Sequence, residues 1–264
     1  LFRNNNIKPL VGDFVDIDII DEEKALGHIT KILPRKNTLI RPAVSNVDII
    51  AIVQSTASPK PRPYLMDKYF INVQKYDIDF ILIWTKSDLI DDEAKEYIEV
   101  YKSVGIKSFI ISEKASDINE YDLLIDFLKG KTTALAGVSG VGKSSLINKM
   151  CERKRMEVGS LSKKIERGKH TTRHSEIFCI DKDTYIYDTP GFSSIELSDM
   201  DEEDLESYYR EMAKLSGNCK FNKCSHITEP NCKIKDALNC GKISKMRYDN
   251  YTKIYQELKA KRRH

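Results

Sequence analysis

Gly137-Val-Ser-Gly-Val-Gly-Lys143-Ser144 fits the pattern G-x-x-x-x-G-K-[ST]. It lies between an apolar stretch at 132–136, a predicted strand, and a predicted helix at 144–151. Glycines in such a loop let backbone N–H groups close around phosphate oxygens, and the helix start adds a favourable dipole. We expect Lys143 to bind the β- and γ-phosphates and the Ser144 hydroxyl to ligate Mg²⁺. The alternative, a glycine-rich turn with an exposed lysine, does not explain the strand–loop–helix order.

Short apolar strands alternate with helical patterns around this loop, from residue 46 to about 198. Apolar strands separated by helices favour an α/β fold with a mostly parallel sheet covered on both faces. The predicted strands are 47–53, 80–84, 108–111, 132–136, 177–180 and 185–187, and the predicted helices are 64–76, 93–104, 123–129 and 144–151.

The two flanks differ from this central pattern. Residues 2–42 alternate apolar and polar side chains with turn signals, which predicts a small antiparallel β unit. Beyond residue 199 we expect no further strand. That stretch holds an acidic helix start at 201–214, a Cys/His cluster and a helical pattern at 245–261.

Composition narrows the class of protein. Of 264 residues, 41% are hydrophobic and 31% are charged, which allows a packed core and excludes wholesale disorder. The longest apolar run, Phe80 to Trp84, is far too short for a membrane span, and no charged-then-apolar leader opens the sequence. Six cysteines are too few for a disulfide scaffold, so we expect a soluble protein of the reducing cytoplasm. The first residue is Leu1, which predicts an incomplete N-terminus.

Asp188-Thr-Pro-Gly191 follows the predicted strand at 185–187. An aspartate at a strand end can hold Mg²⁺ through water, and the Gly191 N–H can meet a γ-phosphate. Alone, this sequence is a common turn. Downstream of a phosphate loop it predicts a nucleotide-sensing switch.

Thr85-Lys-Ser-Asp88 follows the strongly apolar strand at 80–84. The Asp88 carboxylate can accept hydrogen bonds from the N1–H and N2-amino groups of guanine, whereas adenine would leave that charge unpaired. The Lys86 stem can pack against the base plane. Four such residues alone are usually a solvated loop, but together with a phosphate loop they favour GTP over ATP.

Four residues in one short window have the spacing of metal ligands. Cys219, Cys224, His226 and Cys232 supply the Cys₃His set that suits tetrahedral Zn²⁺. Four protein ligands leave no place for a catalytic water, so we expect a structural site that stabilises a small domain with few strands. Cys240 is a possible substitute ligand.

Positive charge gathers in two stretches, although the net charge is only +3. Residues 149–173 hold nine Lys or Arg against three Glu, and residues 244–264 hold seven against two acids. Such runs are often no more than a solvated face. They also bind phosphate backbones without sequence preference.

The set Thr85–Asp88, Gly137–Ser145, Gly168–His174 and Asp188–Phe192 resembles the motifs of translation-factor-related GTPases. Here the base-reading motif precedes the phosphate loop, whereas ordinary GTPases have it afterwards. With this circular permutation, the β unit in front and the Cys/His cluster behind, the chain resembles the ribosome small-subunit-dependent GTPase family, RsgA or YjeQ. Further matches are Pro9–Asp13, Arg41-Pro42, Asn46–Asp48 and Arg247–Tyr251.

The resemblance implies an N-terminal OB-fold-like β-barrel at 1–45, a circularly permuted GTPase domain at 46–198 and a helical zinc domain at 199–264. It implies hydrolysis of GTP with Mg²⁺, stimulated by the small ribosomal subunit and acting late in the assembly of that subunit. The implied partners are the small subunit and its rRNA, with no membrane, and we expect a monomer. OB-like and zinc domains are frequent RNA-binding modules, so the basic stretches become candidate rRNA contacts.

The resemblance also implies a set of site residues. Ser112 begins a segment similar to the remaining guanine-supporting loop, although Glu113 replaces the usual small residue. Either Thr171 or Thr172 would be the switch threonine that meets Mg²⁺ and the γ-phosphate. The implied GTP-binding residues are Thr85, Lys86, Ser87, Asp88, Ser112, Gly137, Val138, Ser139, Gly140, Val141, Gly142, Lys143, Ser144, Ser145 and Gly191, and the implied Mg²⁺ ligands are Ser144, Thr172 and Asp188.

Phe192 follows Gly191 where Ras-like enzymes carry a glutamine that orients the attacking water. A phenyl ring cannot orient water, so we expect slow intrinsic hydrolysis and a catalytic group from elsewhere. His170 is the candidate, as in the family, and the alternative is a solvent-exposed loop histidine.

Two other functions remain open at this level. An ATP-using kinase or transport ATPase could be built on the same phosphate loop, and Thr85–Asp88 argues against it. A zinc-containing RNA-binding protein with a degenerate nucleotide site is disfavoured by the intact Lys143 and Ser144.

Overall fold

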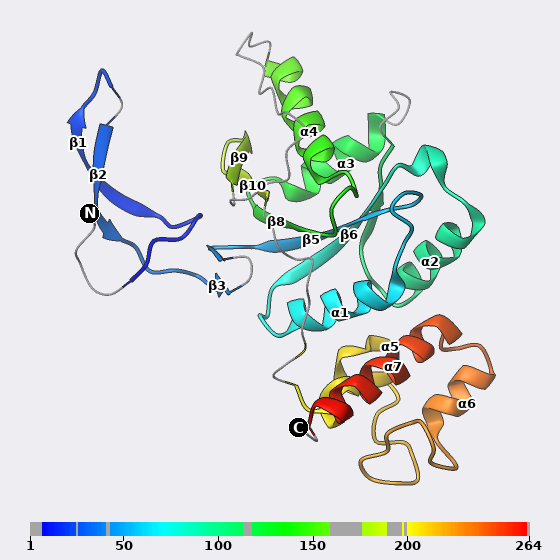
Figure 1. The fold of residues 1–264 in the computed structure, drawn as a ribbon. Coiled ribbons are helices and arrows are strands. Elements are labelled where there is room, and N and C mark those ends of the chain that lie inside the picture. The colour runs from blue at the N-terminus through cyan, green and yellow to red at the C-terminus, as the bar shows by residue number, and fades with distance from the viewer. Residues whose placement is uncertain are drawn as a thin grey trace. The chain divides into compact units, whose positions relative to one another are not determined.

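The computed structural model describes residues 7–24, 26–40, 43–112, 118–158, 176–188, 197 and 200–262. Figure 1 shows the helices and strands of the chain. The chain divides into two units, each assembled from two separate stretches. The first unit spans residues 1–54 and 114–193, and the second spans residues 55–113 and 194–264.

The first unit is built on four strands. In sheet order they are β5 (Ile49–Ser55), β8 (Thr132–Ala136), β10 (Thr184–Asp188) and β9 (Glu176–Asp181). β5 and β10 both pair with β8 in parallel, and β9 pairs with β10 in antiparallel orientation. Every residue of β5 is buried, as expected for an apolar strand in a parallel sheet. The helices of this unit are α3 (Ile118–Leu128) and α4 (Lys143–Val158).

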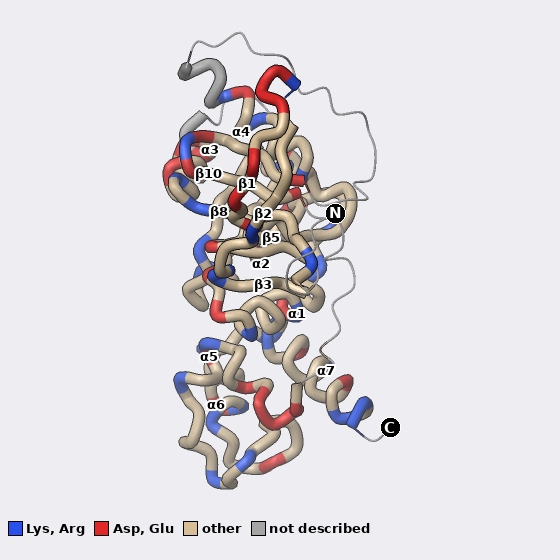
Figure 2. Tube along the Cα trace, turned by 90° about the vertical axis from the view of Figure 1, so that its left-hand side faces the viewer, with Lys and Arg blue, Asp and Glu red and all other residues tan. Residues whose placement is uncertain are grey.

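Two small antiparallel pairs precede β5. β1 (Val15–Asp21) pairs with β2 (Leu26–Ile32), and β3 (Thr38–Leu39) pairs with β4 (Val44–Ser45). They form separate two-stranded sheets, so the described residues do not show the closed barrel expected for residues 1–45. The tip of the β1–β2 hairpin is acidic (Figure 2).

Asp13 fixes the attachment of these strands within the first unit. The Arg35 guanidinium donates to both Asp13 carboxylate oxygens, at 2.7 and 2.8 Å, and the Ser45 hydroxyl donates to the same carboxylate at 2.7 Å. Burial alone would raise the pKa of this carboxyl, but its hydrogen bonds outweigh burial and lower the pKa. At Gly12, whose φ is +96°, a Cβ would clash with the Tyr187 hydroxyl of β10. The sequence Pro9–Asp13 therefore serves attachment to the sheet.

The second unit contains a parallel strand pair and helices from both of its stretches. β6 (Asp79–Thr85) pairs with β7 (Ser108–Ile110). The α-helices are α1 (Pro63–Gln74), α2 (Asp92–Ser103), α5 (Arg210–Ala213), α6 (Lys233–Asn239) and α7 (Lys245–Lys261), and the 3₁₀ helices are η1 (Ser87–Leu89) and η2 (Glu202–Tyr208). One buried apolar cluster includes Ile71 of α1, Leu205 of η2 and Ile254 of α7.

Arg247 of α7 is the centre of a buried ion network in the second unit. It is 3% exposed, its Nη1 pairs with Asp67 of α1, and its Nε donates to Glu211 Oε1 of α5 at 2.7 Å. The Asp67 carboxylate also accepts hydrogen bonds from Asn250 Nδ2 at 2.7 Å and from the Tyr101 hydroxyl of α2 at 2.9 Å. The network therefore joins α1, α2, α5 and α7.

All six strands predicted between residues 46 and 198 are present, with ends displaced by at most two residues. The helix predicted at 201–214 is wrong in type. The chain forms the 3₁₀ helix η2 and the single turn α5, separated by Tyr209 in an extended conformation. This break places the Tyr209 ring, 1% exposed, edge-on to Tyr251 at 5.4 Å between centroids. No helix in the described part of the chain has the length and apolar character needed to cross a membrane.

We predict that Arg247→Met lowers the free energy of unfolding by about 3–5 kcal/mol at neutral pH, because two carboxylates remain buried without their cation. Urea unfolding measures this loss. Lys245→Met is the control on the same helix. It removes only the exposed Lys245–Asp249 pair and should change stability by about 0.5 kcal/mol or less.

The loss from Arg247→Met should also depend on pH. Burial raises the pKa of Asp67 above its ordinary value of 3.8, and Arg247 opposes that shift. A raised carboxyl pKa contributes stability that is present below the ordinary pKa and is lost as pH rises through the raised value. Protonated Asp67 needs no cation, so the variant should approach the parent as pH falls towards 3.8. An equal loss at every pH would contradict this account.

Candidate nucleotide site and metal centre

The loop at 137–142 joins β8 to α4 in the first unit. Gly137, Gly140 and Gly142 have φ values of +142°, +81° and +96°, which side chains rarely tolerate. A Cβ at Gly137 would also clash with the Val53 carbonyl oxygen of β5. The glycines are therefore required by the path of the backbone, and the first turn of α4 carries no acidic residue that would repel an anion.

Lys143 folds back over this loop. Its Nζ donates to the carbonyl oxygens of Gly137 at 2.7 Å and Val138 at 3.1 Å. Burial lowers the pKa of Lys143, and the nearby Asp188 carboxylate opposes that shift. The ammonium group is thus held against the backbone of the loop at 137–142, where it can contact a bound phosphate.

Asp188 lies at the carboxyl end of β10, next to the start of α4. The carboxyl ends of parallel strands meet at one edge of a sheet, and Asp188 stands opposite Leu135 of β8 in the register. Its Oδ2 is 3.4 Å from Ser144 Oγ, and the residue is 1% exposed. A hydroxyl and a carboxylate are the oxygen ligands that Mg²⁺ prefers, so this pair fits the predicted ion.

The predicted base-reading residues lie in the second unit, at the carboxyl ends of β6 and β7. Thr56 holds them: its Oγ1 donates to the carbonyl oxygens of Thr85 at 3.1 Å and Lys86 at 2.7 Å. Ser87 N donates to Ile111 O at 3.2 Å, which places this turn beside the residue that precedes Ser112. Asp88 is exposed.

The turn holds Lys86 in a backbone conformation that residues with side chains rarely adopt. Lys86 is a non-glycine residue with φ +59°, and its Nζ donates to the Ser58 carbonyl oxygen. Thr56 was not predicted from the sequence. It stands just after β5 as Thr85 ends β6, and a small hydroxyl residue at a strand end was its only sequence signal.

The four predicted metal ligands come together in the second unit. The ligand atoms of Cys219, Cys224, His226 and Cys232 all lie within 4.8 Å of one another. Cys219 Sγ is 3.8 Å from Cys232 Sγ, and His226 Nδ1 is 3.6 Å and 3.3 Å from those two sulfurs. A zinc tetrahedron has S–S edges of about 3.8 Å and N–S edges of about 3.6 Å, given Zn–S of about 2.3 Å and Zn–N of about 2.0–2.1 Å. The cluster therefore fits zinc.

The local electrostatics of this cluster also favour a cation. Burial and the neighbouring cysteines raise the pKa of the Cys224 thiol to about 12, and a metal cation bound between the thiols would oppose that shift. The Lys233 N–H donates to Cys219 Sγ at 3.3 Å. Cys240 is exposed and bonds to the Ala237 carbonyl oxygen, outside the cluster.

Several predicted residues lie outside the described part of the chain. These are His170, Thr171, Thr172, Gly191 and Phe192, together with Glu113 of the guanine-supporting segment.

Several members of the basic stretch at 244–264 serve other contacts, among them Lys261 with Glu257 at 4.0 Å and Arg262 with Glu202 at 3.5 Å. Arg247 is buried in the ion network and Lys245 pairs with Asp249. The end of α7 remains basic, as Figure 2 shows, with Lys259, Lys261 and Arg262. In the other stretch, Arg153 pairs with Asp122 at 3.0 Å.

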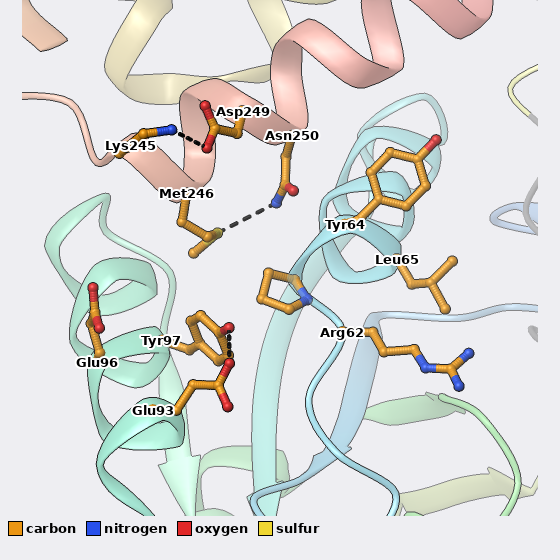
Figure 3. Close-up of a pocket in the computed structure, with 11 residues that line it drawn as sticks. Arg62, Tyr64, Leu65, Glu93, Glu96, Tyr97, Lys245, Met246, Asp249 and Asn250 are labelled. Carbon is orange, nitrogen blue, oxygen red and sulfur yellow. Dashed lines mark hydrogen bonds and ion pairs between the residues drawn. The ribbon is translucent and has the colours of Figure 1, made fainter.

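A cavity of about 780 Å³ opens in the second unit between the start of α1, α2 and α7 (Figure 3). Four of its polar side chains pair with one another, Tyr97 with Glu93 at 2.6 Å and Lys245 with Asp249 at 2.6 Å. Its lining includes none of the residues predicted to bind nucleotide or metal.

Strand, glycine loop and helix define an α/β protein of the phosphate-loop class. A family model described as RsgA GTPase matches residues 32–198. A protein of Agathobacter rectalis named small ribosomal subunit biogenesis GTPase RsgA is 46% identical over 264 residues, covering 100% of this chain and 87% of the relative. The protein of the same name from Ruminiclostridium cellulolyticum is 45% identical, covering 98% and 84%. The chain belongs to the RsgA GTPase family.

Two solved structures share the fold. YloQ, described as a circularly permuted GTPase, matches with a TM-score of 0.73 and 33% identity, covering 98% of this chain and 84% of that one. YjeQ from Thermotoga maritima matches with a TM-score of 0.72 and 33% identity, covering 96% and 85%. These matches confirm the family resemblance and the α/β fold predicted from the sequence.

We predict that Gly137→Ala lowers the free energy of unfolding more than Gly130→Ala does, by about 1–3 kcal/mol. Both glycines have positive φ, but a Cβ at Gly130 meets nothing within 4 Å, whereas one at Gly137 clashes with Val53 O. Urea unfolding of the two variants separates the clash from backbone strain. Equal losses would mean that β5 can yield to the added methyl group.

Proposed function

We propose that this chain is a GTPase that binds the small ribosomal subunit and couples GTP hydrolysis to late maturation of that subunit and to its own release. The observation that carries the proposal is the convergence of Lys143, Ser144 and Asp188 at one edge of the sheet, beside the start of α4. The names of its relatives supply the ribosomal context. The site of action would be the cytoplasm, and the protein would act as a monomer.

The nucleotide would be bound by the phosphate-loop residues and the base-reading residues predicted from the sequence. The backbone of the loop at 137–142 and the Lys143 ammonium would bind the phosphates. Asp88 would accept two hydrogen bonds from guanine, with Lys86 packed on the base and Ser112 supporting it. The remaining proposed contacts are Thr85, Ser87, Ser144, Ser145 and Gly191.

Hydrolysis transfers the γ-phosphoryl group of GTP to water and yields GDP and phosphate. Ser144, Asp188 and either Thr171 or Thr172 would hold Mg²⁺, which neutralises phosphate charge when bound. Lys143 would balance the negative charge that develops on the leaving β-phosphate. The buried position of Asp188 limits water around that charge, which strengthens the interaction.

We also propose that the protein alone hydrolyses GTP slowly. Phe192 follows Gly191 in the sequence and offers no group that orients water. We therefore assign the orientation of water to His170, brought into use when the small subunit is bound.

The Cys₃His cluster would hold a structural Zn²⁺. Three thiolates and one imidazole complete a tetrahedron and leave no position for a catalytic water.

We propose residues 199–264 as the zinc domain, residues 46–198 as the permuted GTPase domain and residues 1–45 as an OB-fold-like domain. The antiparallel pairs β1–β2 and β3–β4 support the last of these. The basic end of α7 would contact rRNA backbone.

GTP turnover measured with small subunits, large subunits and neither tests the proposed function. We expect slow turnover by the protein alone and stimulation by small subunits only. Equal stimulation by both subunits, or equal turnover of ATP, would contradict the proposal.

Asp88→Asn tests the assignment of the base. We expect the affinity for GTP to fall by about 10- to 100-fold, because a charged acceptor of two hydrogen bonds is lost. Affinity for xanthosine triphosphate should rise, since its O2 accepts from the new amide. Asp92→Asn makes the same charge change at an exposed position paired with Lys95 and should leave both affinities unchanged. Fluorescent-nucleotide titration of the parent and of both variants measures these affinities.

A further inference from the structure

The outer nitrogen of the His226 ring faces a carboxylate from a distant segment. His226 Nε2 lies 2.9 Å from Glu206 Oε2, and the two side chains are 3% and 19% exposed. Glu206 belongs to η2, twenty residues before the histidine. No pattern in the sequence connects these two residues.

Geometry determines which nitrogen carries the hydrogen. Nδ1 is the ring atom inside the cluster, 3.3 Å from Cys232 Sγ. A metal-bound nitrogen must be unprotonated, so Nε2 carries the hydrogen and donates it to Glu206. The carboxylate therefore selects the tautomer that a metal requires.

Outside the cluster itself, the other hydrogen bond to His226 in the described structure acts on its backbone. Its carbonyl oxygen accepts a hydrogen bond from the Tyr248 hydroxyl at 2.7 Å, and its φ is +62°. The Tyr251 ring lies beside the imidazole, with 6.1 Å between centroids, and offers it no hydrogen bond in the described structure. Glu206 thus restrains the rotation of the ring about its Cβ–Cγ bond from the side opposite the cysteine sulfurs.

Two neighbouring acids of η2 pair with basic residues outside the cluster. Glu202 pairs with Arg262, and Glu203 pairs with Lys223. For Glu206, the second oxygen Oε1 is buried and has no hydrogen-bond partner among the described residues. Burying a carboxylate with one partner is unfavourable unless that partner is a strong donor. An imidazole whose opposite nitrogen binds a cation is such a donor.

We infer that Glu206 is a positioning residue of the metal centre, which orients the His226 imidazole and raises the affinity of the cluster for zinc. This inference rests on the proposed zinc site. The hydrogen bond from His226 to Glu206 also connects η2 to the metal centre. In the chain, η2 is the next described helix after β10, the strand that ends in Asp188.

Zinc affinity of the full chain, measured by competition of Zn²⁺ with a chromophoric chelator, tests the inference. Glu206→Ala should weaken zinc binding by about 10- to 100-fold. Glu206→Gln keeps an acceptor without the charge, so its affinity should lie between those of Glu206→Ala and the parent. Asp204→Asn is the control, because it removes a charge from an exposed position of the same helix and should not change the affinity.

A second background separates positioning from general support of the fold. His226→Cys replaces the imidazole by a fourth thiolate and leaves Glu206 with no ring to orient. In that background Glu206→Ala should change zinc affinity by about twofold or less. Equal losses in both backgrounds, or no loss in either, would overturn the inference. Failure of the parent chain to bind zinc would overturn the proposed metal site itself, a result distinct from either.

Discussion

Parallel pairing of β8 with β5 on one side and β10 on the other sets the geometry of the candidate phosphate site. Parallel strands end at the same edge, so the loop after β8 and Asp188 at the end of β10 meet there. Ser144 and Asp188 are 44 residues apart in the chain and 3.4 Å apart in space for this reason. The same packing explains Gly137, since the neighbouring strand β5 leaves no room for a Cβ.

The second unit uses ionic and metal-binding side chains for a similar purpose. Its two stretches of chain, 55–113 and 194–264, meet where Arg247 binds Asp67 and Glu211 inside an otherwise apolar interior. Removing one member leaves a buried charge without a partner. The network therefore favours the one packing of its helices in which every charge is paired. The Cys/His cluster brings together a stretch of chain that has little other regular structure, and the hydrogen bond to Glu206 connects the cluster to η2. The segment Arg247–Tyr251 matched the family pattern, but no role for it was apparent from the sequence. In the structure Arg247 and Asn250 belong to the ion network, and Tyr248 and Tyr251 contact His226 of the Cys/His cluster.

Sequence patterns predicted the strands well because β5 is buried throughout and β6 and β8 over most of their length, so that each appears in the sequence as an apolar run. The region after residue 199 was harder, since a metal cluster and a buried tyrosine replace helical periodicity there. η2 and α5 appear where one helix was expected, and the short α6 was not predicted. The contiguous site motifs were visible in the sequence, but Thr56 and Glu206 were not. Each belongs to a segment whose local pattern carries no sign of what it contacts.

Local chemistry was determined by the sequence alone: a glycine loop ending in Lys143 and Ser144, a carboxylate after each of two apolar strands, and four soft ligands in one window. These depend on neighbours along the chain, where spacing is enough to state what a group can bind. Tertiary structure decided which distant groups meet, such as Asp67 with Arg247 and Glu206 with His226. Those pairs arise from strand order and helix packing, which bring together side chains that no local pattern relates.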